Sequence, residues 1–285
     1  MSIVTRRAVV HLRALLLVFC VAFGHAASGQ SLFVIPTDSP TGPGVADEQP
    51  LLVSLHLREP AALAKVLDVP APVAGADVLR YVMQDYPAIS PGTKRAWSEP
   101  SFVVDYLDPS VTALGREFAT ARAESGAVGP PTPGDLVRFV HGVIRGSRDR
   151  GLDVASEIAA IRLGDCKNYA VLTVALARAA GVPARVVFGI VLLRFDTRYG
   201  AYGHAWAEVL VDGRWVAADA ALTAEHARVR YLPFGVLENE GMGYALDAAR
   251  LTPVWVQRVE VLGAASTGSP LPQSPRTGVP RFVLR

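Results

Sequence analysis

Cysteine is scarce in this sequence. Only two cysteines, Cys20 and Cys166, occur among its 285 residues. Cys20 lies in an N-terminal segment with the order of a cleaved export signal, so the mature chain keeps Cys166 alone. A single cysteine in an exported protein forms no internal disulfide. Cys166 is therefore an inert buried thiol, an intermolecular link or a nucleophile.

The usual patterns for metal binding are missing as well. The sequence has no Cys-x-x-Cys pair, no His-Glu-x-x-His and no second clustered histidine. His204 and Glu208 fall on the same face of a predicted strand, but two candidate ligands alone do not indicate a metal site. We therefore expect neither a metal nor a cofactor.

Charge of one sign is not concentrated, and long apolar runs are few. The formal net charge is +2, and residues 1–26 hold three arginines and no acid, so the remaining chain has a charge near −1. A nucleic-acid partner would require a clustered basic face. A membrane-spanning helix needs about 20 apolar residues. We therefore expect no nucleic-acid partner and no stable membrane insertion once the signal is cleaved.

The first 26 residues have the order of a secretory signal. Arg6, Arg7 and Arg13 precede an apolar stretch at residues 14–24, and small residues follow it. We expect cleavage just after this segment and a periplasmic or secreted mature chain. An uncleaved membrane anchor is the alternative.

The N-terminal region, residues 27–99, gives weak structural signals and no functional one. Residues 36–50 are rich in proline and glycine, which predicts a flexible linker. Loose alternation of apolar residues predicts a strand over residues 51–57. Short helices are predicted over residues 60–67 and 76–84.

A more regular order of elements begins near residue 100. We expect a strand over residues 101–107, followed by a helix that Asp108 caps and that has Pro109 at its first position. Asp135 is expected to cap a second, amphipathic helix. His141 in that helix has apolar neighbours, so a packed or surface role is expected for it.

The second half of this region predicts one buried helix and several strands. The helix from Cys166 to residue 180 is apolar nearly all round, and Gly181 is expected to end it. Asp212-Gly213 is a strong hairpin signal. The predicted strands cover residues 185–195, 205–211, 214–218 and 254–262. From residue 263 to residue 285 the composition predicts a disordered tail.

Cys166, His204 and Asp219 form the constellation that suggests chemistry. The hairpin turn makes its two strands antiparallel neighbours. His204 lies eight residues before Asp212 and Asp219 lies six residues after Gly213, so both residues are expected at the same end of the hairpin. A helix start favours the thiolate form of a cysteine, a histidine can exchange its proton, and an aspartate can orient that histidine.

The motifs around these residues closely resemble the core of the transglutaminase-like superfamily, as in an exported bacterial member. They read Gly-Asp-Cys-Lys-Asn-Tyr-Ala around Cys166 and Gly-His-Ala-Trp-Ala-Glu-Val around His204, with Asp219 after them. The resemblance covers roughly residues 100–225, and we assign residues 226–262 to a C-terminal extension of this core. It implies an α+β fold with a papain-like Cys-His-Asp site, in which the cysteine opens a buried helix packed on an antiparallel sheet.

The resemblance also implies acyl transfer from a protein or peptide substrate. The thiolate would attack a carboxamide or peptide carbonyl, and an amine or water would release the acyl group. Crosslinking, deamidation and hydrolysis stay open, as do the second oxyanion donor and the oligomeric state. The alternatives are a cysteine peptidase or amidase of the cell envelope, or a non-catalytic binding or assembly module. Trp206 shares a strand face with His204, so it either lines the site or belongs to the core.

Overall fold

The computed structural model describes most of the chain. The described residues are 33–39, 49–66, 70, 72, 75–83, 95–147, 151–222, 229–251 and 256–265. The export signal predicted over residues 1–26 lies outside them, as do most of the predicted linker and most of the predicted C-terminal tail. Within the described part, no helix has the length and apolar character needed to cross a membrane.

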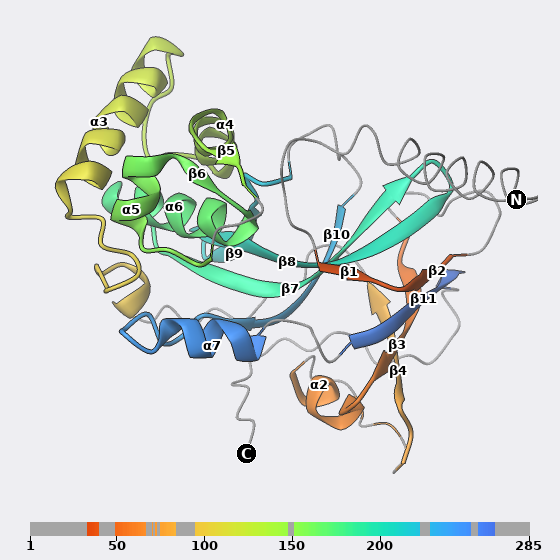
Figure 1. The fold of residues 1–285 in the computed structure, drawn as a ribbon. Helices are drawn as coiled ribbons and strands as arrows, with labels where there is room; N and C mark the ends of the chain where they lie inside the picture. The colour runs from red at the N-terminus through yellow and green to blue at the C-terminus, as the bar shows by residue number, and fades with distance from the viewer. Residues whose placement is uncertain are drawn as a thin grey trace, which may run out of the picture.

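A long antiparallel sheet forms the centre of the fold (Figure 1). Its strands are β1 (Phe33–Ile35), β7 (Ala184–Phe195), β8 (Arg198–Val211), β9 (Arg214–Ala218) and β10 (Val229–Val236). Their order is β1-β8-β7-β10, and β9 pairs with β8. Because β7 occupies one edge of β8, β1 and β9 share the other edge. β1 pairs with residues 201–203 and β9 with residues 207–211, which places His204 between them.

Four helices gather at one end of this sheet (Figure 1). They are α3 (Pro109–Glu124), α4 (Pro133–Val143), α5 (Ala155–Ile161) and α6 (Cys166–Ala179). α6 packs on β7 and β8, and the other three surround it. Alternate residues of β8, Ala205, Ala207 and Val209, belong to the same buried cluster as α6. The first residue of α6 is therefore held between a helical layer and the sheet.

A second sheet lies at the other end of the molecule (Figure 1). Its order is β2-β11-β3-β4, from β2 (Thr37–Asp38), β3 (Leu51–Leu57), β4 (Val78–Met83) and β11 (Val256–Ala264). The short helix α2 (Pro60–Val66) packs beside β4. A buried cluster joins this sheet to Ile190, Leu192 and Leu232 of the first sheet. The N-terminal region thus shares a core with the distal halves of β7 and β10.

Four small elements complete the described chain. They are the 3-10 turn η1 (Arg95–Trp97), the helix α7 (Tyr244–Leu251) and the two-stranded parallel pair β5 (Arg145–Gly146) and β6 (Leu163–Gly164). The β5–β6 pair ties the end of α4 to the residues that lead into α6. It thereby fixes the approach to Cys166.

The predicted α+β class, with a buried helix that starts at Cys166 on an antiparallel sheet, is confirmed. The hairpin turn is also where it was predicted, with positive φ angles at Asp212 and Gly213. The strand before that turn is longer than predicted, because β8 begins at Arg198. β10 was not predicted, and it supplies a residue to the site.

Two predicted elements are wrong. Residues 78–83 form a strand rather than a helix, because alternate residues are buried as β4 pairs in register with β3. Residues 101–107 form no strand. Their polar groups bond instead to loops and a helix start: Val103 N donates to Glu240 O, and Asp105 Oδ1 accepts from Ser156 N at 2.9 Å.

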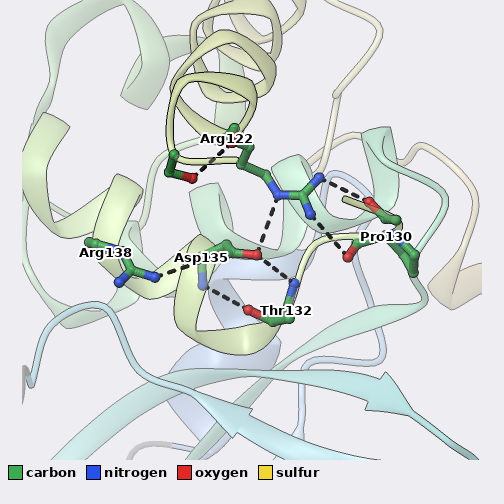
Figure 2. A network of polar contacts seen from close by, with 7 residues as sticks. Arg122, Pro130, Thr132, Asp135 and Arg138 are labelled. Atoms are coloured by element: carbon green, nitrogen blue, oxygen red, sulfur yellow. Dashed lines mark hydrogen bonds and ion pairs between the residues drawn. The ribbon is translucent and has the colours of Figure 1, made fainter. Parts of the chain in front are cut away.

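The N-terminus of α4 also differs from the prediction. The cap is Thr132, with Pro133 at the first helical position, and Asp135 is the third residue of the helix. Asp135 N donates to Thr132 Oγ1 and Thr132 N donates to Asp135 Oδ2, which makes a reciprocal capping box (Figure 2). Arg122 donates to the same carboxylate, at 3.3 Å. Burial raises the pKa of Asp135, but these hydrogen bonds and the charge of Arg122 outweigh it, so the pKa lies below its usual value.

Candidate active site

The residues around Cys166 explain why a helix starts there. Asp165 is the N-cap, and its Oδ1 accepts a hydrogen bond from Lys167 N at 3.1 Å. The side chain of Asn168 completes a reciprocal capping box, because its Oδ1 accepts a hydrogen bond from Asp165 N at 3.1 Å. A Cβ atom at Gly164 would lie 2.3 Å from Asn168 Cβ, so this turn requires glycine. Gly164, Asp165 and Asn168 each have a structural reason, and together they place Cys166 at the first position of α6.

Cys166 occupies the electropositive end of α6. As the first helical residue, it offers a backbone N–H that has no acceptor within the helix, at the end where the aligned amides leave a partial positive charge. Its side chain is buried, with 6% of the residue exposed. Lys167 forms an ion pair with Asp165 rather than standing free beside the thiol.

His204 and Asp219 are brought together as the hairpin geometry predicts. His204 Nε2 donates a hydrogen bond to Asp219 Oδ2 at 2.8 Å. His204 lies in the middle of β8 and Asp219 directly follows β9, and both residues are buried. With its proton on Nε2, the neutral ring keeps a lone pair on Nδ1, which is the atom left to exchange a proton.

The third partner of this arrangement is Cys166. Within the described residues, His204 Nδ1 is buried without a hydrogen bond of regular geometry. Burial lowers the pKa of His204. The charge of Asp219, its hydrogen bond and the neighbouring Cys166 side chain outweigh burial and raise the pKa to about 10. The site therefore favours an imidazolium between a carboxylate and a sulfur.

The segment that carries these residues matches a known protein family. Residues 136–220 match the family model described as the transglutaminase-like superfamily. This segment is similar to the core of that superfamily. It runs from α4 to the residue after Asp219 and so contains Cys166, His204 and Asp219. None of the curated proteins matches the sequence significantly.

Two solved structures resemble the chain only loosely. One is described as a "putative cysteine protease" from Cytophaga hutchinsonii: it is 14% identical, the match covers 84% of this chain and 83% of that one, and the TM-score is 0.37. The other is the periplasmic domain of TgpA from Pseudomonas aeruginosa: it is 21% identical, the match covers 53% of this chain and 55% of that one, and the TM-score is 0.32. With TM-scores this low, neither likeness carries an argument about the site.

Asp219 accepts hydrogen bonds from other groups besides His204. Its Oδ1 accepts from the backbone N–H groups of Ala221 at 3.0 Å and Leu222 at 3.2 Å. Its Oδ2 accepts from Tyr231 Oη at 3.0 Å as well as from His204. Four hydrogen bonds thus fix both carboxylate oxygens. Tyr231 was not among the predicted site residues because its strand, β10, was not predicted: Pro233 and Gly235 weaken the strand signal of the residues around them.

Trp206 packs against the imidazole ring of His204. Its ring stacks with that of His204, with centroids 6.1 Å apart and planes at 18°, and 1% of the residue is exposed. The sequence left open whether Trp206 lines the site or belongs to the core. Both hold, because Trp206 is a core residue that also contacts His204.

His141 lies closer to the site than its sequence context suggests. It is exposed on α4, and its Nδ1 donates a hydrogen bond to the carbonyl oxygen of Ala220 at 3.1 Å. Its ring centroid is 6.4 Å from that of Tyr169. Because Ala220 follows Asp219, this contact ties α4 to the segment that carries the carboxylate. His141 is a surface residue, as expected, with a structural contact of its own.

Proposed function

We propose that this protein is an exported thiol enzyme that performs acyl transfer or hydrolysis on a carboxamide or peptide carbonyl, with Cys166, His204 and Asp219 as its catalytic triad. The observation that carries the proposal is the 2.8 Å hydrogen bond from His204 Nε2 to Asp219 Oδ2, with Cys166 as the other neighbour of the imidazole. An imidazole set between an acid and a thiol is what activation of a cysteine requires.

The reaction would proceed in two steps. The Cys166 thiolate attacks the carbonyl carbon, the carbon–nitrogen bond breaks, and the proton on His204 Nδ1 passes to the leaving amine. The product is an acyl thioester on Cys166. A water molecule or a second amine then gives a proton to Nδ1 and attacks the thioester carbon, and the sulfur leaves as thiolate. Asp219 holds the imidazole in the same tautomer throughout and transfers no proton.

Stabilisation of the oxyanion would come from the start of α6. The backbone N–H of Cys166 has no acceptor within its helix, so it is available to the carbonyl oxygen as negative charge develops there. The positive end of the helix dipole acts in the same direction.

Export is part of the proposal. The order of basic, apolar and small residues at the N-terminus supports a cleaved signal, and with it a periplasmic or secreted enzyme that acts on proteins or peptides outside the cytoplasm. Intact-mass measurement of the exported chain tests this step. A mature N-terminus between Ala26 and Gln30 supports it, whereas retention of residues 1–25 favours the membrane anchor.

The acyl-transfer step can be tested without knowledge of the natural substrate. We expect p-nitrophenyl acetate to acetylate Cys166 as p-nitrophenolate leaves, and intact mass with peptide mapping will locate the acetyl group. Addition of a simple primary amine, such as glycinamide, then divides the thioester between hydrolysis and amide formation. Cys166→Ala is the control and must show no thioester.

The outcomes separate the candidate functions. Preferred transfer to the amine supports a transglutaminase-type reaction, and preferred hydrolysis supports a peptidase or amidase. A folded wild-type protein whose Cys166 is not acetylated faster than an exposed thiol would contradict the proposed function and leave a binding or assembly module.

A further inference from the structure

The catalytic carboxylate oxygen is shared by two donors from different strands. Asp219 Oδ2 accepts from His204 Nε2 of β8 at 2.8 Å and from Tyr231 Oη of β10 at 3.0 Å. We infer that Tyr231 is a positioning residue of the site, which acts on His204 through Asp219; this inference rests on the proposed function. The tyrosine would set both the direction in which the carboxylate points and the strength with which it holds the imidazolium.

Tyr231 remains a donor under all conditions in which the enzyme would work. Burial, the charge of Asp219 and the hydrogen bond to that carboxylate raise the pKa of Tyr231 well above its ordinary value. The phenol therefore keeps its proton, and a protonated phenol beside a carboxylate can only donate to it. The Tyr231–Asp219 contact thus persists while the imidazole gains and loses a proton.

The ring of Tyr231 is held by the same tryptophan that stacks on His204. The centroids of Tyr231 and Trp206 lie 5.0 Å apart, with an angle of 55° between the planes. Trp206 in turn stacks with the imidazole. The rings of Tyr231 and Trp206 thus pack beside the His204–Asp219 pair, which is buried, and burial strengthens electrostatic interactions there.

Close approach of β10 to β7 positions Tyr231 relative to Trp206. A Cβ atom at Gly189 of β7 would lie 2.2 Å from Leu232 O and 2.9 Å from the ring of Trp206. Glycine at this position lets the residue after Tyr231 and the indole pack against the same backbone. Gly189 is also the β7 partner of His204 in the ladder. The tyrosine, the tryptophan and the histidine are therefore placed by one local feature of the sheet.

Because Tyr231 and His204 both donate to Asp219 Oδ2, loss of one donor should change the hydrogen bond of the other. While Tyr231 donates to Oδ2, part of the acceptor strength of that oxygen is directed away from His204. Loss of the hydroxyl leaves His204 as the single side-chain donor to Oδ2 among the described contacts, so the imidazolium is held more strongly. The carboxylate also loses one of its four hydrogen bonds and is oriented less well. Removal of the hydroxyl should therefore raise the pH at which His204 loses its proton and slow acyl transfer.

Tyr231→Phe tests this, with Tyr244→Phe as the matched control. Tyr244 Oη likewise donates a hydrogen bond, to Leu152 O at 3.1 Å, and none of its contacts within the described residues involves Cys166, His204 or Asp219. Acetylation of Cys166 by p-nitrophenyl acetate is measured from pH 5 to pH 11 in both variants and in wild type. For Tyr231→Phe we expect about a ten-fold slower acetylation step and an upper pH limit higher by about half a unit or more. Tyr244→Phe should match wild type in both.

The second readout needs no activity. The proton on His204 Nε2 is followed by proton NMR in the far-downfield region, where hydrogen-bonded imidazole protons resonate. In Tyr231→Phe it should move further downfield, because Oδ2 becomes a stronger acceptor. In an Asp219→Asn background, Tyr231→Phe should cause no further change, since the shared carboxylate is gone.

These results separate the inference from the proposed function. If wild type forms no thioester but the resonance moves in Tyr231→Phe, the proposed function fails and the coupling of Tyr231 to His204 stands. If Tyr231→Phe is folded by circular dichroism and shows an unchanged resonance and an unchanged upper pH limit, the inference is overturned. It is overturned even when acetylation is slower, because the effect would then be one of packing.

Discussion

Arg185 of β7 lies directly opposite Glu208 of β8, and its guanidinium is clamped between two tryptophan rings. Arg185 Nε donates to Glu208 Oε2 at 2.5 Å, and both side chains are completely buried. The guanidinium carbon lies 4.7 Å from the ring centroid of Trp97 and 4.0 Å from that of Trp215. A buried charge pair at one register position disfavours any slip of β8, which would turn His204 to the other face of the sheet.

This pair predicts a large loss of stability when only one partner is removed. Arg185→Ala leaves Glu208 buried without its opposite charge and should cost about 3–5 kcal/mol in the free energy of unfolding. The control is Arg95→Ala, which breaks the exposed pair of Arg95 and Glu99 and should cost less than about 1 kcal/mol. Urea unfolding at pH 7 measures both. Equal losses in the two variants would show that the buried pair does not lock the strands.

The environment of His204 predicts how stability depends on pH. The pKa of His204 is raised from 6.5 to about 10 in the folded protein, so the folded state keeps this proton where the unfolded state has released it. The stabilisation is fully present below pH 6.5 and is lost as the pH rises towards 10. The stability of wild type relative to His204→Gln should therefore fall across this interval. A difference that stays constant or increases, measured by denaturant unfolding, would contradict the charged state assigned to His204.

Replacement of Gly189 in β7 and of Gly115 in α3 by alanine should change the free energy of unfolding in opposite directions. Gly189→Ala forces the β10 backbone or Trp206 to move and should cost about 1–3 kcal/mol. Gly115→Ala in α3 meets no atom within 4 Å and should stabilise the protein by about 0.5–1 kcal/mol. Thermal unfolding compares the two. If Gly189→Ala is neutral, close packing of β10 on β7 does not constrain the site.

The three triad residues predict a hierarchy of activity losses. Cys166→Ala should abolish thioester formation, because no sulfur remains to attack. His204→Ala should remove nearly all turnover, since the imidazole both accepts and returns the proton. Asp219→Ala should retain about ten- to a hundred-fold more activity than His204→Ala, because Asp219 orients the imidazole but transfers no atom.

Acetylation rates of the three variants provide the measurement, and circular dichroism confirms that each is folded. A folded His204→Ala variant with near-normal turnover would overturn the roles. If Asp219→Ala falls as low as Cys166→Ala, the aspartate does more than orient the histidine.

The sequence was most informative where structure is set by neighbouring residues. The start of α6 follows from the cap at Asp165, its end from Gly181, and the hairpin from Asp212-Gly213, so Cys166, His204 and Asp219 could be related from the sequence alone. The short range of these signals also explains the errors. Residues 78–83 are a strand because β3 pairs with them, and that pairing depends on residues far along the chain.

The same limit explains why Tyr231 was missed. Its hydroxyl bonds to a carboxylate 12 residues earlier in the chain, and the contact depends on the order β8-β7-β10. No motif at Tyr231 itself indicates this role. The family resemblance located the three residues of the proposed triad, whereas the partner that orients the aspartate became visible only from the packing of β10.

The central claim is that His204 activates Cys166 as a nucleophile, and alkylation of the native protein at pH 6 tests it most directly. An ordinary thiol, with a pKa of about 8.5, is almost wholly protonated at this pH and reacts slowly with iodoacetamide. Peptide mass spectrometry can follow Cys166 separately from any other thiol. We predict that Cys166 of wild type is alkylated at pH 6 at least about ten-fold faster than a free thiol of ordinary pKa, and that folded His204→Ala loses this advantage. Slow alkylation in wild type, or an equal rate in His204→Ala, would contradict the account.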